Sequence, residues 1–196
     1  MTAAAAPPRR LQCSAWCAVA AVLATGSLLA WYAPTAALDW QPARAAAEPW
    51  RCVSAAFVHW SARHLAANLA GTVVVAALGA AAGLGRRAAL AWLVAWPATH
   101  AALALQPALA HYGGLSGVLH SGVAIAGLDL VRRARGARRM VGGAILAGLA
   151  LKLGVEAPWG APLVRPPDWD IAIAPFAHFT GAVAGLVCAW LLLPAR

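Results

Sequence analysis

The sequence predicts an all-α membrane protein, a six-transmembrane helix bundle, and three observations predict this class. Of the 196 residues, 62% are hydrophobic and only 11% are charged, which is too apolar for a soluble domain. Mean hydropathy is +0.70. The charged residues gather in short clusters between apolar stretches, and several stretches are long enough to cross a hydrocarbon core about 30 Å thick. The four cysteines show no C-x-x-C spacing, which argues against a metal site or a disulfide framework.

The apolar stretches predict six spans in chain order. The uncharged segment 88–128 is too long for one helix and is broken at Gln106-Pro107 and again at Tyr112-Gly113-Gly114, so it predicts two helices. The fifth span contains Lys152, whose ammonium group must reach the membrane interface. We expect residues 1–196 to form a single membrane domain. Its spans are predicted at about 12–32, 56–82, 88–105, 115–131, 137–155 and 173–193.

Positive charges predict the orientation of these spans. Six spans place both termini on one side, and ten of the 15 Lys and Arg residues fall there, which makes that side cytoplasmic. They are Arg9, Arg10, Arg86, Arg87, Arg132, Arg133, Arg135, Arg138, Arg139 and Arg196. Five of the six acidic residues fall in the two long loops on the other side, at about 33–55 and 156–170. The sixth, Asp129, is expected to form an ion pair with Arg132 or Arg133.

Polar side chains within the predicted spans form three clusters, although lipid cannot satisfy their hydrogen bonds. His64 and Asn68 lie one helical turn apart near the outer end of the second span. Ser116 and His120 follow a glycine-rich turn at the start of the fourth span. His178 lies near the outer end of the sixth span. Intramembrane groups of this kind are candidates for a functional site.

The predicted topology places these clusters at similar depth, because the second, fourth and sixth spans all run from outside to inside. A hydroxyl nucleophile needs a base, and an acyl intermediate needs hydrogen-bond donors aimed at its oxyanion. We therefore expect Ser116 as nucleophile, His178 as base, and His64 with Asn68 as oxyanion donors. We expect no acidic group at that depth, so the residues predict a Ser-His dyad rather than a triad.

These residues resemble the motifs of the rhomboid family of intramembrane serine proteases, over most of residues 48–190. The resemblance implies a rhomboid-like six-span fold and catalysis without a cofactor or a metal. It also implies that Gly114, Gly117, His120, Gly181 and Gly185 support the site. The matching motifs are H-x-x-x-N at His64 and Asn68, G-x-S-G at Gly114, Ser116 and Gly117, and A-H-x-x-G-x-x-x-G at Ala177, His178, Gly181 and Gly185.

Within that family, the run from Gly114 to His120 is similar to rhombosortase, a bacterial branch paired with substrates that carry a C-terminal Gly-Gly sorting tail. This resemblance implies a single-span membrane protein as substrate, cut near the outer face of the bilayer. It also implies that His120 lies under the His178 ring, either packing against it or sharing a hydrogen bond with it, and we favour packing over proton transfer. The Ala-, Arg- and Gly-rich composition suits a bacterium, so we expect the inner membrane, an active site open to the periplasm, and no nucleic-acid partner.

Two alternatives stay open at the level of sequence. An inactive rhomboid-like protein would bind transmembrane helices without cutting them. A small transporter would also carry polar residues in its helices, although transporters commonly contain inverted repeats, and none is visible here. A zinc protease is disfavoured because H-E-x-x-H is absent from the sequence. His59, His100 and His111 have no predicted role.

Overall fold

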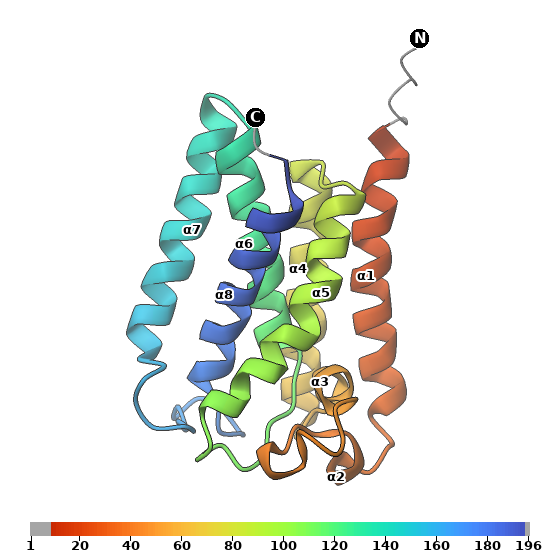
Figure 1. Ribbon diagram of the computed structural model, residues 1–196, viewed down its shortest axis with the longest axis vertical. Coiled ribbons are helices and arrows are strands. Elements are labelled where there is room, and N and C mark those ends of the chain that lie inside the picture. Colours follow the sequence, from red (N-terminus) through yellow and green to blue (C-terminus); the bar gives the residue numbers. More distant parts are fainter. Residues whose placement is uncertain (1–8, 195–196) are drawn as a thin grey trace.

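Six long helices form one bundle in the computed structural model, which describes residues 9–194 (Figure 1). Short helices lie in the connections at one end, which we call the loop end. The first long helix begins and the last one ends at the opposite end of the bundle (Figure 1). The long helices are α1 (Arg9–Ala30), α4 (Ala62–Ala82), α5 (Arg86–Ala101), α6 (Ser116–Arg133), α7 (Ala137–Glu156) and α8 (Pro175–Leu192); the short ones are α2 (Thr35–Leu38), α3 (Arg51–Ser54) and the 3-10 turns Pro42–Arg44, Ala55–Phe57 and Ala102–Leu105.

Two predicted helix boundaries need correction. The second span begins at Ala62 and not near residue 56, because the chain first makes a short turn and then an N-cap at Ser61. The Ser61 side chain accepts a hydrogen bond from the His64 backbone N–H at 3.0 Å, which starts the helix there. The fifth helix continues through Glu156, one residue beyond its predicted end. The remaining predicted ends agree with the helices to within about four residues.

Six membrane crossings are expected from the rhomboid-like resemblance. Within residues 9–194, three helices are long enough and apolar enough to cross a membrane. These are Ala62–Ala82, Arg86–Leu105 and Pro175–Leu192, whereas the apolar part of α1, Ala15–Ala30, is shorter. Helices α6 and α7 carry charges at their ends, including Asp129 and Arg133, which lower their mean hydropathy. The ion pair expected for Asp129 is present, with Arg133 at 3.0 Å. The count of six crossings therefore stays a prediction.

Tryptophans join four of the long helices in the core. Trp16 of α1 stacks on Trp92 of α5, with ring centroids 4.3 Å apart. The Trp16 indole N–H donates to the Val75 carbonyl of α4 at 3.0 Å, and that of Trp92 donates to the Val118 carbonyl of α6 at 2.8 Å. Because a buried indole N–H is more favourable when it finds an acceptor, these bonds help to hold α1, α4, α5 and α6 in one register.

Glycines bring α6 and α8 into backbone contact. A Cβ atom placed on Gly181 would lie 1.9 Å from the Gly117 carbonyl oxygen, and one on Gly185 would lie 2.4 Å from the Ser121 carbonyl oxygen. No side chain fits at these positions, so the glycines permit the close contact of the two helices. This contact places the first turn of α8 beside the first turn of α6.

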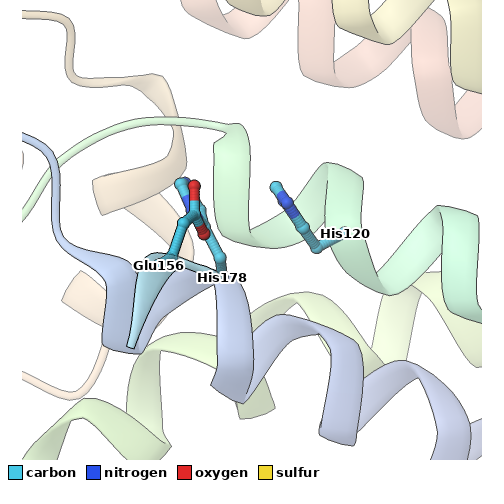
Figure 2. Close-up of side chains that lie close together, drawn as sticks. All are labelled: His120, Glu156 and His178. Atoms are coloured by element: carbon cyan, nitrogen blue, oxygen red, sulfur yellow. The ribbon is translucent and has the colours of Figure 1, made fainter. Parts of the chain in front are cut away.

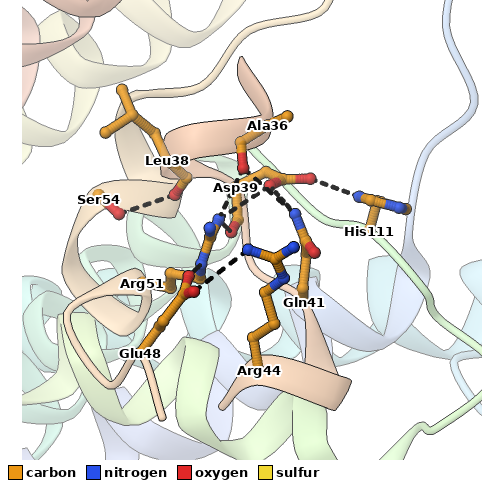
Figure 3. Close-up of polar contacts among 9 residues, drawn as sticks. All are labelled: Ala36, Leu38, Asp39, Gln41, Arg44, Glu48, Arg51, Ser54 and His111. Atoms are coloured by element: carbon orange, nitrogen blue, oxygen red, sulfur yellow. Dashed lines mark hydrogen bonds and ion pairs between the residues drawn. The ribbon is translucent and has the colours of Figure 1, made fainter. Parts of the chain in front are cut away.

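A polar network at the loop end ties the connection after α1 to the segment before α6 (Figure 3). Buried Arg51 donates to the Asp39 carboxylate at 3.1 Å and to the Glu48 carboxylate, and its hydrogen bond holds the pKa of Glu48 below its usual value. The other Asp39 oxygen lies 2.6 Å from His111 Nδ1. Two backbone hydrogen bonds between Trp40 and Tyr112 run alongside. The network therefore braces the turn that leads into Ser116.

Candidate active site

Ser116 and His178 are held together by the close packing of their helices. Ser116 is the first residue of α6, and His178 lies in the first turn of α8, which Pro175 opens. The His178 Nε2 atom is 3.0 Å from the Ser116 Oγ atom. His178 is buried, whereas Ser116 is partly exposed. The spacing allows the imidazole to accept the hydroxyl proton when Nδ1 carries the ring hydrogen.

The expectation that no acidic side chain reaches His178 is wrong. Glu156, the last residue of α7, has its Oε2 atom 2.8 Å from His178 Nδ1 (Figure 2). Its Oε1 atom lies 2.5 Å from Lys152 Nζ, one turn earlier on the same helix. The geometry is thus that of an acid, a histidine and a serine in line. The sequence predicts Glu156 at the start of the outer loop, whereas the helix continues far enough to bring its carboxylate to the imidazole.

His120 packs against His178 from the other side. The two rings stack with centroids 4.3 Å apart and an angle of 12° between their planes. The Nδ1 atom of His120 lies 2.6 Å from the Ser116 carbonyl oxygen, so it donates there. This contact fixes the His120 ring and leaves it no hydrogen bond to His178. The arrangement is the packing that the resemblance implied.

His64 and Asn68 of α4 face Gly114, which precedes the α6 helix. The Asn68 Nδ2 atom is buried and has no hydrogen-bond partner among the described residues. His64 Nδ1 accepts from the Trp60 backbone N–H at 3.4 Å, which leaves the hydrogen on Nε2. A Cβ atom on Gly114 would lie 2.8 Å from His64 Nε2 and 3.6 Å from Asn68 Nδ2. Glycine, at φ +132°, therefore keeps the space in front of both donors open.

One cavity of about 290 Å³ joins these groups. Its wall includes Ser116, His178, His64 and Asn68, together with Lys152 and Glu156 of α7. The connection between α7 and α8 contributes residues 171–174 to the same wall. A second, more apolar groove of about 420 Å³ runs between α4 and α7 over the surface of α6 and also reaches Ser116.

The family model of the rhomboid domain matches residues 46–195. The chain belongs to the rhomboid family. Rhomboid proteins are intramembrane serine proteases, so the domain indicates intramembrane protease activity. With the apolar helices it also indicates an integral membrane protein. A search of curated proteins found no match.

Within the part of the rhomboid chain that the structure describes, one group of three side chains has the composition of a metal site. The ligand atoms of His120, Glu156 and His178 lie within 4.8 Å of one another. The Lys152 ammonium group is 2.5 Å from Glu156 and 3.5 Å from His178 Nδ1, so a fixed positive charge already occupies this position. We therefore interpret the cluster as a hydrogen-bonded arrangement around His178.

Sequence reasoning missed Lys152 and Glu156 as part of the site, although a signal was present. They are an i, i+4 pair of opposite charge, which favours continuation of the helix through Glu156. The fifth and sixth predicted spans meet at the outer side, which places the end of one beside the start of the other. Of the histidines without a predicted role, His100 Nδ1 lies 2.6 Å from the Cys52 carbonyl oxygen and His59 Nδ1 lies 3.1 Å from that of Phe57, whereas His111 lines the cavity.

Proposed function

We propose that this rhomboid protein is an active serine endopeptidase that cleaves single-span membrane proteins from the loop end of its bundle. The observation that supports this best is the 3.0 Å contact between Ser116 Oγ and His178 Nε2 in a cavity that also receives the unpaired Asn68 amide. A buried donor with no partner is unfavourable in a resting protein. It is useful where an oxyanion forms during the reaction.

In the proposed reaction, His178 Nε2 takes the Ser116 proton as Oγ bonds to the substrate carbonyl carbon. His64 Nε2–H, Asn68 Nδ2–H and a backbone N–H at the start of α6 donate to the resulting oxyanion. The imidazolium then protonates the leaving amine as the C–N bond breaks. Water repeats the sequence on the ester and releases the second product, which restores the serine and the neutral histidine.

The groove between α4 and α7 supports a helical substrate. Its wall is largely apolar, including Val74, Val75 and Leu149, and it reaches Ser116. A transmembrane helix could enter there without exposing its apolar side chains to water. Small residues at the scissile bond would help that helix unwind, because glycine is a poor helix former.

The finer assignments rest on resemblance and charge. The run from Gly114 to His120 supports a rhombosortase-like specificity for substrates with a C-terminal Gly-Gly sorting tail. The arginine clusters support cytoplasmic termini and a bacterial inner membrane with a periplasmic site; Arg196 lies outside the described residues. We also propose a single membrane domain over residues 1–196 with six crossings, although residues 1–8 and 195–196 lie outside the described chain.

The test is co-expression of the chain with a membrane-anchored reporter that carries a Gly-Gly sorting tail, with cleavage followed by size. We expect the parent to cut the reporter, and the Ser116→Ala and His178→Ala variants to accumulate normally without cutting. The matched control is Ser27→Ala, the same chemical change in α1, where the hydroxyl bonds only to the Leu23 carbonyl of its own helix.

Cleavage by the Ser116→Ala variant would refute the serine mechanism. Cleavage of a generic single-span reporter but not of the Gly-Gly reporter would keep the protease function and remove the rhombosortase specificity. If the parent binds membrane helices and cuts neither reporter, the protein is an inactive helix-binding member of the family.

A further inference from the structure

The pair formed by Lys152 and Glu156 has no part in the proposed Ser-His chemistry, yet it contacts His178 directly. The Glu156 carboxylate bridges two groups, with Oε2 2.8 Å from His178 Nδ1 and Oε1 2.5 Å from Lys152 Nζ. Lys152 Nζ itself lies 3.5 Å from the same imidazole nitrogen. Figure 2 shows the carboxylate beside the His178 ring, with His120 projecting from α6 nearby.

We propose that Glu156 is a positioning residue that fixes the tautomer and orientation of His178, with Lys152 as its ion-pair partner. The reactive arrangement would then be acid, histidine and serine, contributed by α7, α8 and α6. This inference rests on the proposed protease function, because it assigns to Glu156 a role in the same reaction.

The tautomer argument follows from donor and acceptor chemistry. An ionised carboxylate only accepts hydrogen bonds, so Glu156 requires a hydrogen on His178 Nδ1. The Nε2 lone pair then faces the Ser116 hydroxyl and can accept its proton. Lys152 only donates, so an unopposed ammonium group at Nδ1 would favour hydrogen on Nε2 and leave the serine without a base. The shorter contact, 2.8 Å against 3.5 Å, belongs to Glu156.

The charge argument points the same way. When Ser116 Oγ bonds to the carbonyl carbon, its proton moves to His178 Nε2 and the imidazole becomes positively charged. The Glu156 carboxylate stabilises that charge through the Nδ1–H hydrogen bond and keeps its own ionised state. It also neutralises Lys152, whose ammonium group would otherwise oppose the imidazolium across 3.5 Å. His178 later gives this proton to the leaving amine. Glu156 therefore neither gains nor loses a proton in the reaction.

The surroundings offer His178 no other carboxylate among the described residues that line the cavity. Besides Glu156, the titratable groups there are His64 from α4, His120 from α6, Lys152 from α7, and His111 and Tyr112 from the connection that precedes α6. His111 already faces the Asp39 carboxylate at 2.6 Å. Glu156 is therefore the acidic group of this wall, and no described neighbour is placed to replace it.

A purely structural role for this pair makes different predictions. An i, i+4 ion pair with one partner half exposed stabilises a helix only slightly. Its loss would change stability a little and would leave kcat unaltered. The two roles therefore separate in kinetics, on the full-length protein in detergent or in lipid vesicles with a cleavable single-span substrate.

We expect Glu156→Gln to lower kcat on the order of 10²-fold with little change in KM or in thermal unfolding. The Lys152 ammonium group would retain the amide oxygen, which turns the NH2 group toward His178 Nδ1 and imposes the unproductive tautomer. Adding Lys152→Met to Glu156→Gln frees the amide to turn its oxygen to Nδ1–H, and should recover about tenfold in kcat. Lys152→Met alone keeps the Glu156 contact and should stay within about threefold of the parent.

Glu156→Asp keeps a carboxylate and should have a higher kcat than Glu156→Gln. If Glu156→Gln is less stable than the parent, this second variant still tests whether the carboxylate is needed. The control is Asp168→Asn, which removes an exposed carboxylate from the neighbouring connection and should change nothing. Labelling of Ser116 by a fluorophosphonate probe gives a readout that needs no protein substrate, and it should slow in parallel with kcat.

If Glu156→Gln has the same kcat and the same Ser116 labelling rate as the parent, this inference is wrong and the protease function is unaffected. Equal kcat in the aspartate and glutamine variants, or no recovery in the double variant, would also count against it. A parent that neither cuts nor labels would overturn the protease function and this inference together.

Discussion

At the scale of single residues, Asn68 carries the side-chain amide that we assign to the oxyanion. Asn68 lines the cavity that contains Ser116, and its Nδ2 atom has no hydrogen-bond partner among the described residues. Its backbone carbonyl, by contrast, accepts from Thr72 Oγ1 at 2.8 Å. The position of the amide before Gly114 fits the oxyanion role that we propose.

We expect Asn68→Ala to lower kcat by about 10²–10³-fold, the usual effect of removing one oxyanion donor. The free energy of unfolding should stay the same or rise, because the change removes an unpaired buried amide. Reporter cleavage with purified protein and thermal unfolding in the same detergent would measure both quantities.

Thr72→Ala is the control, because Thr72 lies one turn further along the same helix, does not line the cavity and bonds to Asn68 only at its backbone carbonyl. It should leave kcat unchanged, with a small loss of stability. Asn68→Ala at parent activity would contradict the oxyanion role, and a large loss of stability would show that the amide has a structural partner.

At the scale of helices, the contact between α6 and α8 decides the distance between nucleophile and base. The two backbones touch at Gly117, the residue after Ser116, and at Gly181, one turn after His178. Because helices are stiff, an added atom at the contact moves the whole first turn of α8. The 3.0 Å spacing at the site therefore depends on residues that take no part in the chemistry.

Gly181→Ala is expected to destabilise the protein by about 1–3 kcal/mol, as overpacking generally does, and to abolish most of the cleavage. Its Cβ would lie 1.9 Å from the Gly117 carbonyl oxygen, so the helices must separate. The measurement is cleavage rate and thermal unfolding side by side.

Gly143→Ala in α7 is the matched control, because nothing lies within 4 Å of the added Cβ. Alanine there should be neutral or slightly stabilising in a helix. If Gly181→Ala retains both stability and cleavage, the close contact between α6 and α8 does not position His178.

At the scale of the whole molecule, the bundle keeps its charges at its two ends and leaves one side open. At the end opposite the loop end, Arg132 donates to the Trp190 carbonyl at 3.3 Å and Arg138 to the Ala82 carbonyl at 3.0 Å, so each satisfies the C-terminal turn of a neighbouring helix. Between α4 and α7 the apolar groove leads to Ser116. This arrangement suits a substrate that arrives from the lipid.

Gly148→Leu should therefore raise KM for a membrane-embedded substrate by about tenfold, while labelling of Ser116 by a small fluorophosphonate stays near the parent rate. Gly148 borders the groove, and nothing lies within 4 Å of its added Cβ, so a side chain can start there and extend into the groove. KM values in lipid vesicles and labelling rates in detergent give the comparison.

Gly154→Leu on the same helix is the control, because its added Cβ also meets nothing within 4 Å and the residue does not line the groove. An unchanged KM for Gly148→Leu would mean that the substrate reaches Ser116 by another path.

The sequence by itself determined the helical elements and four of the residues that meet at the cavity. Long apolar stretches can only be helices in a bilayer, and alternating direction brings His64, Asn68, Ser116 and His178 to one depth. The packing of the helices decided two further features of the site that the sequence pattern does not predict. Whether Glu156 is a loop residue or an active-site acid depends on one further residue of helix and on where α7 lies against α8. Which amide stays unpaired depends on the space that Gly114 leaves, because hydrogen bonding of a buried group is set by its neighbours in space and not along the chain.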